Sequence, residues 1–227
     1  MKELRLSEEL LLFAIDEKKG VVPLIKASLI KLGLAGAVLY ELEDRGKLEL
    51  DGDRVKVLDE DPTGDSILDK SLKKISASKK KKKVAHWLPK IGKKSLKVSI
   101  TQELLTKGML RKIDDDEPGW SFRRGGRYRP WFDTPLKHTE QKLREILLHH
   151  RQPGEKNLKL IGLLHACRLY SLVFEQREEY REAKEKARRL SEDDRIRKGI
   201  RSAVNNKRGQ VASSLLSGVF AIIKEAC

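Results

Sequence analysis

Apolar residues in this sequence return every three or four positions over most of its length. The clearest run passes through Leu29, Leu32, Leu39 and Leu42 and stops at Gly46. This spacing places apolar side chains on one face of an α-helix, and a glycine often follows a helix end. The pattern therefore predicts an all-α fold. Helices are expected at about residues 7–15, 24–45, 66–75, 95–107, 134–150, 155–190, 191–208 and 211–223.

Capping residues and glycines mark several of these helices. Ser7 is expected to be the N-cap of the first helix, and Pro62-Thr63-Gly64-Asp65 is expected to cap the third. Gly108 is expected to end the fourth. Gly33 and Gly36 lie inside the second helix, where each costs about 1 kcal/mol relative to alanine. We expect them to permit the close approach of another element, more often a packed helix than a ligand.

Three segments depart from the helical pattern. A short β-hairpin is expected near 47–58, where alternating apolar residues flank an Asp-Gly turn. A second hairpin is expected near 109–133, with aromatic and arginine residues alternating around a Gly-Gly pair. The segment 76–84 contains five consecutive lysines, whose mutual repulsion predicts an exposed, mobile loop without regular structure.

The positive charge is concentrated in the middle of the chain. The formal net charge is +15, and residues 70–131 hold 19 basic side chains against 5 acidic ones. A concentrated field of this kind attracts an anionic partner to one face. Three interpretations remain open on charge alone: a solvated face, a nucleic-acid surface with arginines between aromatic rings, or a surface for anionic membrane lipids.

Motifs for catalysis and for metal binding are absent from the sequence. It has no Gly-x-Ser-x-Gly elbow, no Gly-x-Gly-x-x-Gly fingerprint and no His-Glu-x-x-His helix. His149-His150 and the pair His165 and Cys167 lack third and fourth ligands at a usual spacing, so we interpret them as structural. We expect no enzyme, no metal and no cofactor.

The length and the cysteine content fit a single domain, 1–227, in a reducing compartment. Cys167 and Cys227 are the only cysteines, too few for a disulfide scaffold. The longest uncharged apolar stretch, 211–223, has 13 residues, fewer than the roughly 20 of a membrane-spanning helix, and it is expected to be a buried helix. No signal peptide is recognised at the N-terminus, so we expect a cytoplasmic protein.

Several motifs occur together in an order that resembles the Golgi phosphoprotein 3 family. They run as follows: Leu6-Ser7-Glu8-Glu9-Leu10-Leu11-Leu12, Gly33-Leu34-Ala35-Gly36-Ala37-Val38-Leu39 continuing to Glu41-Leu42, Arg45-Gly46-Lys47-Leu48, Pro62-Thr63-Gly64-Asp65 with Leu68-Asp69, and Lys107-Gly108-Met109-Leu110. The Pro-Thr-Gly-Asp element is the most specific of them. Because so little chain precedes the first expected helix, we expect a prokaryotic relative.

The resemblance implies a helical bundle wrapped by amphipathic helices, with a projecting β-hairpin near 109–133. It also implies a peripheral membrane protein that is not an enzyme and that binds phosphatidylinositol 4-phosphate. In such proteins the hairpin serves membrane contact and self-association. The hairpin side chains to which these roles would fall are Trp120, Phe122, Arg123, Arg124, Tyr128 and Trp131.

The resemblance also places the lipid-phosphate site. Its basic pair falls on Lys94 and Lys97, which lie three apart and so share a helix face. Lys26 and Ala35 occupy the positions at which the family has a tryptophan and an arginine. This chain therefore lacks the planar arginine donor and has a lysine point charge instead. With Lys93 beside them, these lysines form a basic face expected to hold anionic phospholipid headgroups.

A nucleic-acid-binding module is the alternative prediction. In that case the second helix and a hairpin would bind the nucleic acid in the manner of a winged helix.

Overall fold

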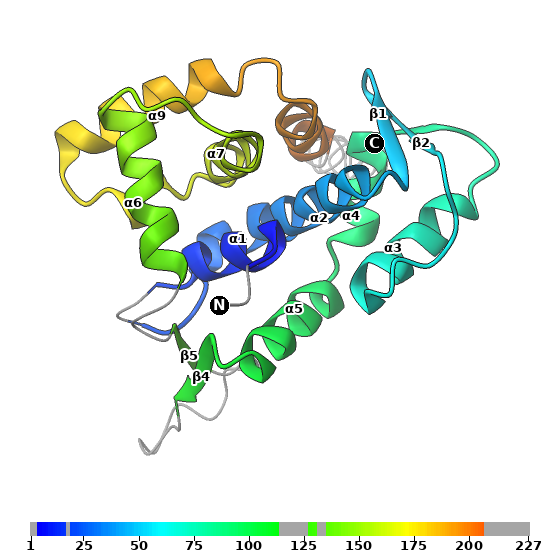
Figure 1. Cartoon of the computed structure of the whole chain (residues 1–227), viewed down its shortest axis with the longest axis horizontal. Coiled ribbons are helices and arrows are strands. Elements are labelled where there is room, and N and C mark those ends of the chain that lie inside the picture. The colour runs from blue at the N-terminus through cyan, green and yellow to red at the C-terminus, as the bar shows by residue number, and fades with distance from the viewer. Residues whose placement is uncertain (1–3, 17–18, 114–126, 131–134, 207–227) are drawn as a thin grey trace, which may run out of the picture.

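The computed structural model describes residues 4–16, 19–113, 127–130 and 135–206 (Figure 1). The chain is mostly helical with two small antiparallel sheets, as predicted. Its first half contains α1 (Leu6–Ala14), the 3-10 helix η1 (Leu24–Lys26), α2 (Ala27–Asp44), β1 (Leu48–Asp51), β2 (Arg54–Val57), α3 (Ser66–Ser76) and β3 (Lys82–Lys83). Then follow α4 (Val84–Ile91), α5 (Lys94–Thr106), β4 (Leu110–Ile113), β5 (Arg127–Pro130), α6 (Pro135–Leu148), α7 (Glu155–Cys167), α8 (Tyr170–Val173) and α9 (Arg177–Leu190). Residues 195–206 form a further helix.

Helix α2 is the centre of the fold. It passes through the middle of the molecule and contacts α1, α3, α4, α5 and α7 (Figure 1). Every residue from Leu32 to Leu42 is buried. The outer helices bury one face only; in α3 the buried residues recur at helical spacing, whereas the lysines between them are exposed. The predicted bundle with amphipathic outer helices is therefore confirmed.

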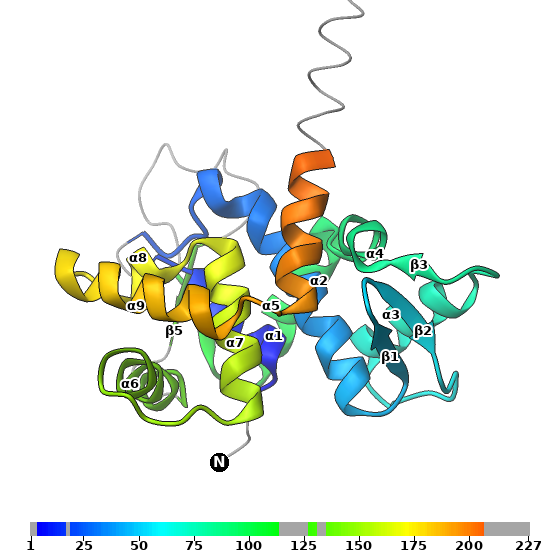
Figure 2. The same ribbon diagram turned by 90° about the horizontal axis from the view of Figure 1, so that it is seen from above.

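The two glycines within α2 permit close packing, as predicted. A Cβ atom at Gly33 would lie 2.3 Å from Cys167 Sγ at the end of α7. A Cβ at Gly36 would lie 2.4 Å from Ile196 Cγ2 in the helix 195–206, which crosses α2 (Figure 2). Neither position has space for a methyl group without movement of its neighbour.

The first hairpin forms as predicted and gains a third strand. Strands β1 and β2 pair antiparallel, with Leu50 opposite Val55, and β3 pairs with β2. The prediction of a segment without regular structure at 76–84 is therefore wrong at four positions: Ser76 ends α3, Val84 begins α4, and Lys82 and Lys83 form β3. Pairing with β2 supplies their backbone hydrogen bonds, and the Lys83 ammonium lies 2.7 Å from an Asp53 carboxylate oxygen, which offsets the repulsion within the run.

The second hairpin is described only at its base. Strands β4 and β5 pair antiparallel, with Leu110 opposite Pro130 and Ile113 opposite Arg127. The Tyr128 backbone N–H donates a hydrogen bond to the Gly20 carbonyl at 2.7 Å, which ties the segment before η1 to β5. Gly20 has φ +65°, and a Cβ there would lie 2.9 Å from Ile113 Cδ1, so only glycine suits this contact.

Several expected helix boundaries differ from the structure. Helix α1 begins two residues earlier than a Ser7 N-cap would give, because Arg5 is the N-cap and its backbone N–H donates to the Glu8 carboxylate at 2.9 Å. The expected continuous helix 155–190 is interrupted at Arg168, whose φ of +57° ends α7. Asp194, rather than Ser191, accepts a hydrogen bond from the backbone at the start of the last described helix, at 2.8 Å from Arg197 N.

Helix α4 was not predicted. It contains Pro89, a residue that normally argues against a helix interior. Its buried residues, Val84, Trp87, Leu88 and Ile91, nevertheless recur at helical spacing. This pattern was the signal available in the sequence.

Among the described residues no helix combines the length and the apolar character that crossing a bilayer requires. The predicted terminal helix at 211–223 lies outside the described residues. The assignment of 1–227 to a single domain remains a prediction.

Candidate functional site

The motifs that resemble the Golgi phosphoprotein 3 family meet in a partly buried network of ion pairs. The guanidinium of Arg5 pairs with the carboxylates of Asp65 and Glu103. The Lys107 ammonium lies 2.6 Å from Glu8 Oε1, and the Glu8 side chain is fully buried. Residues far apart in the sequence thus neutralise one another beside α1, where each buried charge needs a partner.

The Pro-Thr-Gly-Asp element is a helix cap within this network. Asp65 Oδ1 accepts hydrogen bonds from the backbone N–H groups of Ile67 and Leu68, at 2.9 and 3.1 Å. The Thr63 backbone N–H and hydroxyl both donate to Asp69 Oδ1, at 2.7 and 2.6 Å. These bonds hold the pKa of Asp69 below its ordinary value. The most specific motif of the sequence therefore shapes the start of α3.

Glu41 of α2 adds a buried carboxyl group to the same region. Its Oε1 accepts a hydrogen bond from the Ser7 backbone N–H at 2.7 Å. Burial raises the pKa of Glu41, although the Ser7 bond and the nearby Arg5 oppose that shift. These family motifs serve the scaffold, since their polar groups face one another inside the fold.

The predicted basic pair lies at the N-terminal end of α5. Lys94 is exposed and Lys97 is half-buried, one turn apart on this helix. Burial lowers the pKa of Lys97, and the charges of Lys31 and Lys94 lower it further. The structure thus brings Lys31 of α2 to the predicted pair. We call Lys31, Lys93, Lys94 and Lys97 the α5 basic cluster.

Gly92 fixes the position of this cluster. A Cβ atom at Gly92 would lie 2.2 Å from the Lys31 carbonyl oxygen, so the turn between α4 and α5 rests directly on the backbone of α2. Only a residue without a side chain permits this contact. Lys31 was missed in the sequence because it lies more than 60 positions before Lys94.

The α5 basic cluster has no acidic partner among the described residues, because none of its four ammonium groups forms a salt bridge there. No acidic residue lies in the first turn of α5, and no side chain caps that turn. The positive end of the helix dipole adds to the charge of the lysines. Together they form a site suited to an anion.

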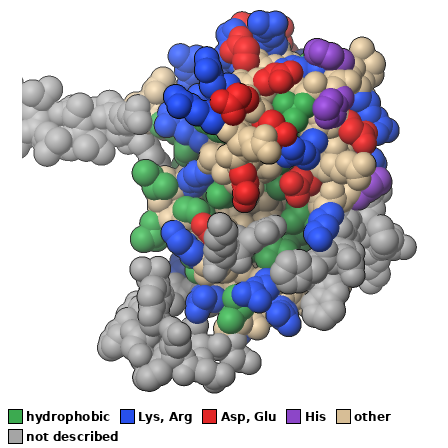
Figure 3. Space-filling view, turned by 90° about the vertical axis from the view of Figure 1, so that its left-hand side faces the viewer, with side chains coloured by type: hydrophobic (Ala, Val, Ile, Leu, Met, Phe, Trp, Pro, Cys, Tyr) green, Lys and Arg blue, Asp and Glu red, His purple; other side chains and the backbone are tan. Residues whose placement is uncertain are grey.

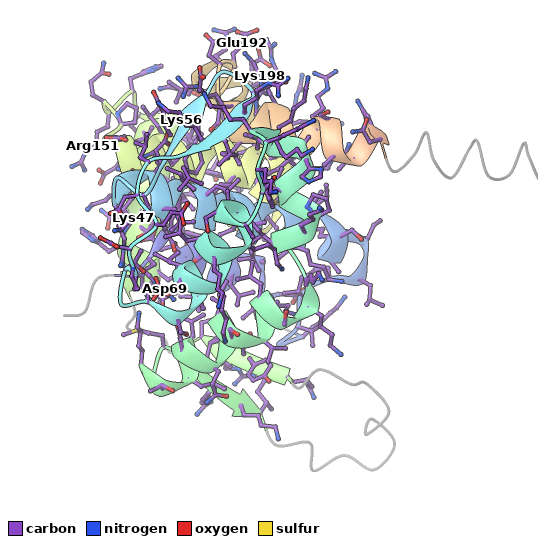
Figure 4. All side chains as sticks on the ribbon, turned by 90° about the vertical axis from the view of Figure 1, so that its right-hand side faces the viewer. Lys47, Lys56, Asp69, Arg151, Glu192 and Lys198 are labelled. Carbon is purple, nitrogen blue, oxygen red and sulfur yellow. The ribbon has the colours of Figure 1, made fainter. Side chains whose placement is uncertain are left out.

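Several other lysines are paired with carboxylates. Lys56 lies 3.1 Å from a Glu49 carboxylate oxygen and Lys198 lies 3.1 Å from one of Asp193, and Lys47 pairs with Asp59 (Figure 4). Unlike the lysines of the α5 basic cluster, these three have an acidic partner.

Two further positions of the predicted site behave differently from Lys94 and Lys97. The Lys26 ammonium donates a hydrogen bond to the Ser171 hydroxyl at 2.8 Å. Burial lowers the pKa of Lys26, and Asp16 partly offsets that shift. Ala35 is fully buried in α2 and contributes no side chain to the surface.

Of the predicted hairpin residues, only Tyr128 lies within the described residues. Its half-buried ring packs against the core. Trp120, Phe122, Arg123, Arg124 and Trp131 lie outside the described residues. Strand β4 follows the C-terminal end of α5, whereas the α5 basic cluster lies at its N-terminal end (Figure 1). A helix of 13 residues separates the two by about 20 Å.

The histidines and Cys167 do not form a metal site. The described residues contain no group of three or more His, Cys, Asp or Glu side chains placed to hold a metal ion. Burial and nearby cations, chiefly Arg197, lower the pKa of His165 to about 4. Burial raises the pKa of Cys167 to about 12, so the thiol stays protonated.

The model of the Golgi phosphoprotein 3 (GPP34) family matches residues 6–206. The chain belongs to the Golgi phosphoprotein 3 family. The match extends from the start of α1 to the last described residue, so it includes the α5 basic cluster and every residue of the ion-pair network except Arg5. This is a family of lipid-binding proteins without enzymatic activity.

Proposed function

We propose that this protein is a peripheral membrane protein that binds anionic phospholipid headgroups at the α5 basic cluster, on the cytoplasmic surface of a membrane. One observation carries the proposal: the contact of Gly92 with the Lys31 carbonyl brings lysines of α2 and α5 together without an acidic partner among the described residues. Burial, and after it the charges of Lys31 and Lys94, lower the pKa of Lys97. A phosphate placed among them would supply the missing opposite charge and relieve this repulsion.

The chemistry of the cluster favours total charge over exact headgroup shape. Each lysine is a point charge on a flexible stem, whereas an arginine binds phosphate in a planar, bidentate manner. The cluster has no arginine, and the position at which the family has one is the buried Ala35. We therefore expect phosphatidylinositol 4-phosphate to bind more tightly than phosphatidylserine because it carries more negative charge.

The β4–β5 hairpin is proposed as a second contact. Aromatic side chains are favoured at the headgroup level of a membrane, so those of a hairpin near the membrane can be placed there. In this proposal Trp120, Phe122, Tyr128 and Trp131, with Arg123 and Arg124, contact the membrane or a second copy of the chain.

The alternative, a nucleic-acid module of the winged-helix type, is disfavoured by the burial of α2. A recognition helix must expose one face to the major groove, whereas Leu32 to Leu42 are all buried. The second helix therefore cannot act in that way.

Vesicle sedimentation with a double charge reversal tests the proposal. We expect Lys94→Glu with Lys97→Glu to weaken binding to vesicles of phosphatidylcholine with phosphatidylinositol 4-phosphate about a hundredfold at about 0.1 M salt, since each reversal removes an attraction and adds a repulsion.

The matched control is Lys79→Glu with Lys81→Glu, which changes the net charge equally at two exposed lysines of the 76–84 segment. We expect less than about a threefold loss for this pair. Equal losses for the two pairs would show a diffuse field without a site. Tight retention of duplex DNA at the same salt, with no vesicle binding, would end the lipid proposal.

A further inference from the structure

Leu24 and Ile25 are the most exposed large hydrophobic side chains of the described residues. Leu24 is 86 % exposed and Ile25 is 89 % exposed. Single exposed apolar residues are common on protein surfaces, but two adjacent ones at this exposure leave almost their whole apolar area in water. Their neighbours therefore determine what they could contact.

These two side chains precede Lys31 of the α5 basic cluster on the same helical segment. The 3-10 helix η1 continues into α2 through Ala27, which has helical φ and ψ. Leu24, Ser28 and Lys31 are consequently spaced to lie on one face, and all three are at least partly exposed. Hydrophobic side chains protrude along one edge of the molecule, with Lys and Arg side chains beside them (Figure 3).

Helix α5 adds a third exposed apolar side chain to this surface. Val98 is 56 % exposed. It lies one turn after Lys94 and next to Lys97, so the lysines of the cluster have apolar neighbours on both helices.

The turn that carries Leu24 and Ile25 is held at both ends. The Lys26 backbone N–H donates to the Pro23 carbonyl at 2.9 Å, and the preceding segment is tied to β5 by the bond from Tyr128 to Gly20. The side chains are thus presented on a fixed turn, which lowers the conformational entropy lost when they are buried.

We propose that Leu24 and Ile25 insert below the headgroups of an anionic bilayer while the α5 basic cluster holds those headgroups. An anionic bilayer has negative charge above an apolar layer, which matches a short apolar projection on the same helical segment as Lys31 of the cluster. A second copy of this chain would bring the same lysines together and repel. Two side chains also cover far less than the roughly 800 Å² that each partner buries in a stable interface.

This inference rests on the proposed function, and monolayer insertion separates the two. The probe is a monolayer of phosphatidylcholine with phosphatidylserine, and the measured quantity is the rise in surface pressure. Leu24→Ser with Ile25→Ser should abolish most of that rise and weaken binding to vesicles of the same composition about tenfold to a hundredfold. Salt should then release the variant more readily than the original chain.

The control is Leu58→Ser, which removes an exposed leucine, 53 % exposed, after β2. It should leave both measurements unchanged. The insertion is refuted, while the lipid site stands, if the original chain binds vesicles and the double serine variant raises the surface pressure as much as the original chain. If the original chain binds no anionic vesicle, both fail. A serine pair that turns a dimer into a monomer without lipid would assign this surface to a second copy and overturn the inference.

Discussion

Replacing Gly33 by alanine should destabilise the protein although alanine is the better helix former. The new Cβ would lie 2.3 Å from Cys167 Sγ and 3.1 Å from Leu10 Cδ2. The sulfur would have to retreat by more than an ångström and give up its contact with the Leu29 carbonyl, 3.4 Å away. Overpacking of this kind costs typically about 1–3 kcal/mol.

The helix propensity of alanine offsets about 1 kcal/mol of that cost. Because an approach of 2.3 Å is far inside van der Waals contact, the overpacking cost should lie in the upper part of that range, about 2–3 kcal/mol. We therefore expect Gly33→Ala to lower the free energy of unfolding by about 1–2 kcal/mol. Urea denaturation measures the change as a lower midpoint with an unchanged slope.

A double-mutant cycle with Cys167→Ala tests the cause. Removing the sulfur removes the closest atom that the new methyl group meets, so the double variant should be more stable than the sum of the two single changes by about 1 kcal/mol or more. A Gly33→Ala variant as stable as the original chain, or a cycle without coupling, would refute the packing argument.

Three further predictions concern buried polar groups. His165→Gln should reduce the loss of stability on acidification. The pKa of His165 is about 4 in the folded state, which is below that of an unfolded histidine. His165 therefore contributes stability that is lost as the pH falls from about 6.5 towards 4. Denaturation midpoints measured between these pH values check this. Glu41→Gln should raise the midpoint at neutral pH, because the raised pKa of Glu41 means that ionising it disfavours the fold as the pH rises; an unchanged pH profile would contradict this. Asp65→Ala should destabilise the chain by about 2 kcal/mol through loss of the α3 cap and of the partner of Arg5, and Asp65→Asn, which keeps a capping oxygen, by less.

The sequence predicts the helices that carry their own end signals. Helix α2 ends before Gly46, which has φ +67°, and α5 ends before Gly108, with φ +69°. In both cases a glycine in the left-handed region marks the end. The break after α7 has no such mark, because Arg168 adopts the left-handed conformation without being glycine. Tertiary packing sets that break, and the sequence pattern alone predicts one long helix.

The candidate site was predicted only in part. The family resemblance pointed to Lys94 and Lys97, and helical spacing within one segment gives the two lysines a shared face. Lys31 could not be predicted in this way, because its approach depends on the contact between Gly92 and the Lys31 carbonyl, which is a property of the folded chain. The exposed turn at Leu24 and Ile25 was also missed, because leucine and isoleucine are usually buried and their exposure here depends on the folded chain.

The motifs that carry the family resemblance turned out to serve the scaffold. Arg5, Glu8, Asp65 and Lys107 pair with one another or with Glu103. The candidate site lies apart from these pairs, at lysines of α2 and α5 that have no acidic partner among the described residues. In this chain the specific motifs identify the family, whereas the proposed lipid site rests on the α5 basic cluster.

The most direct test of the lipid site is an NMR titration of the lysine side chains with soluble glycerophosphoinositol 4-phosphate. Binding at the α5 basic cluster should shift the Nζ and Cε resonances of Lys31, Lys94 and Lys97 in a saturable manner. It should also raise the pKa of Lys97, because the negative charge of phosphate offsets the effects of burial and of the neighbouring lysines that lower it. Small shifts of equal size at all lysines, those of the 76–84 segment included, would contradict a site at this end of α5.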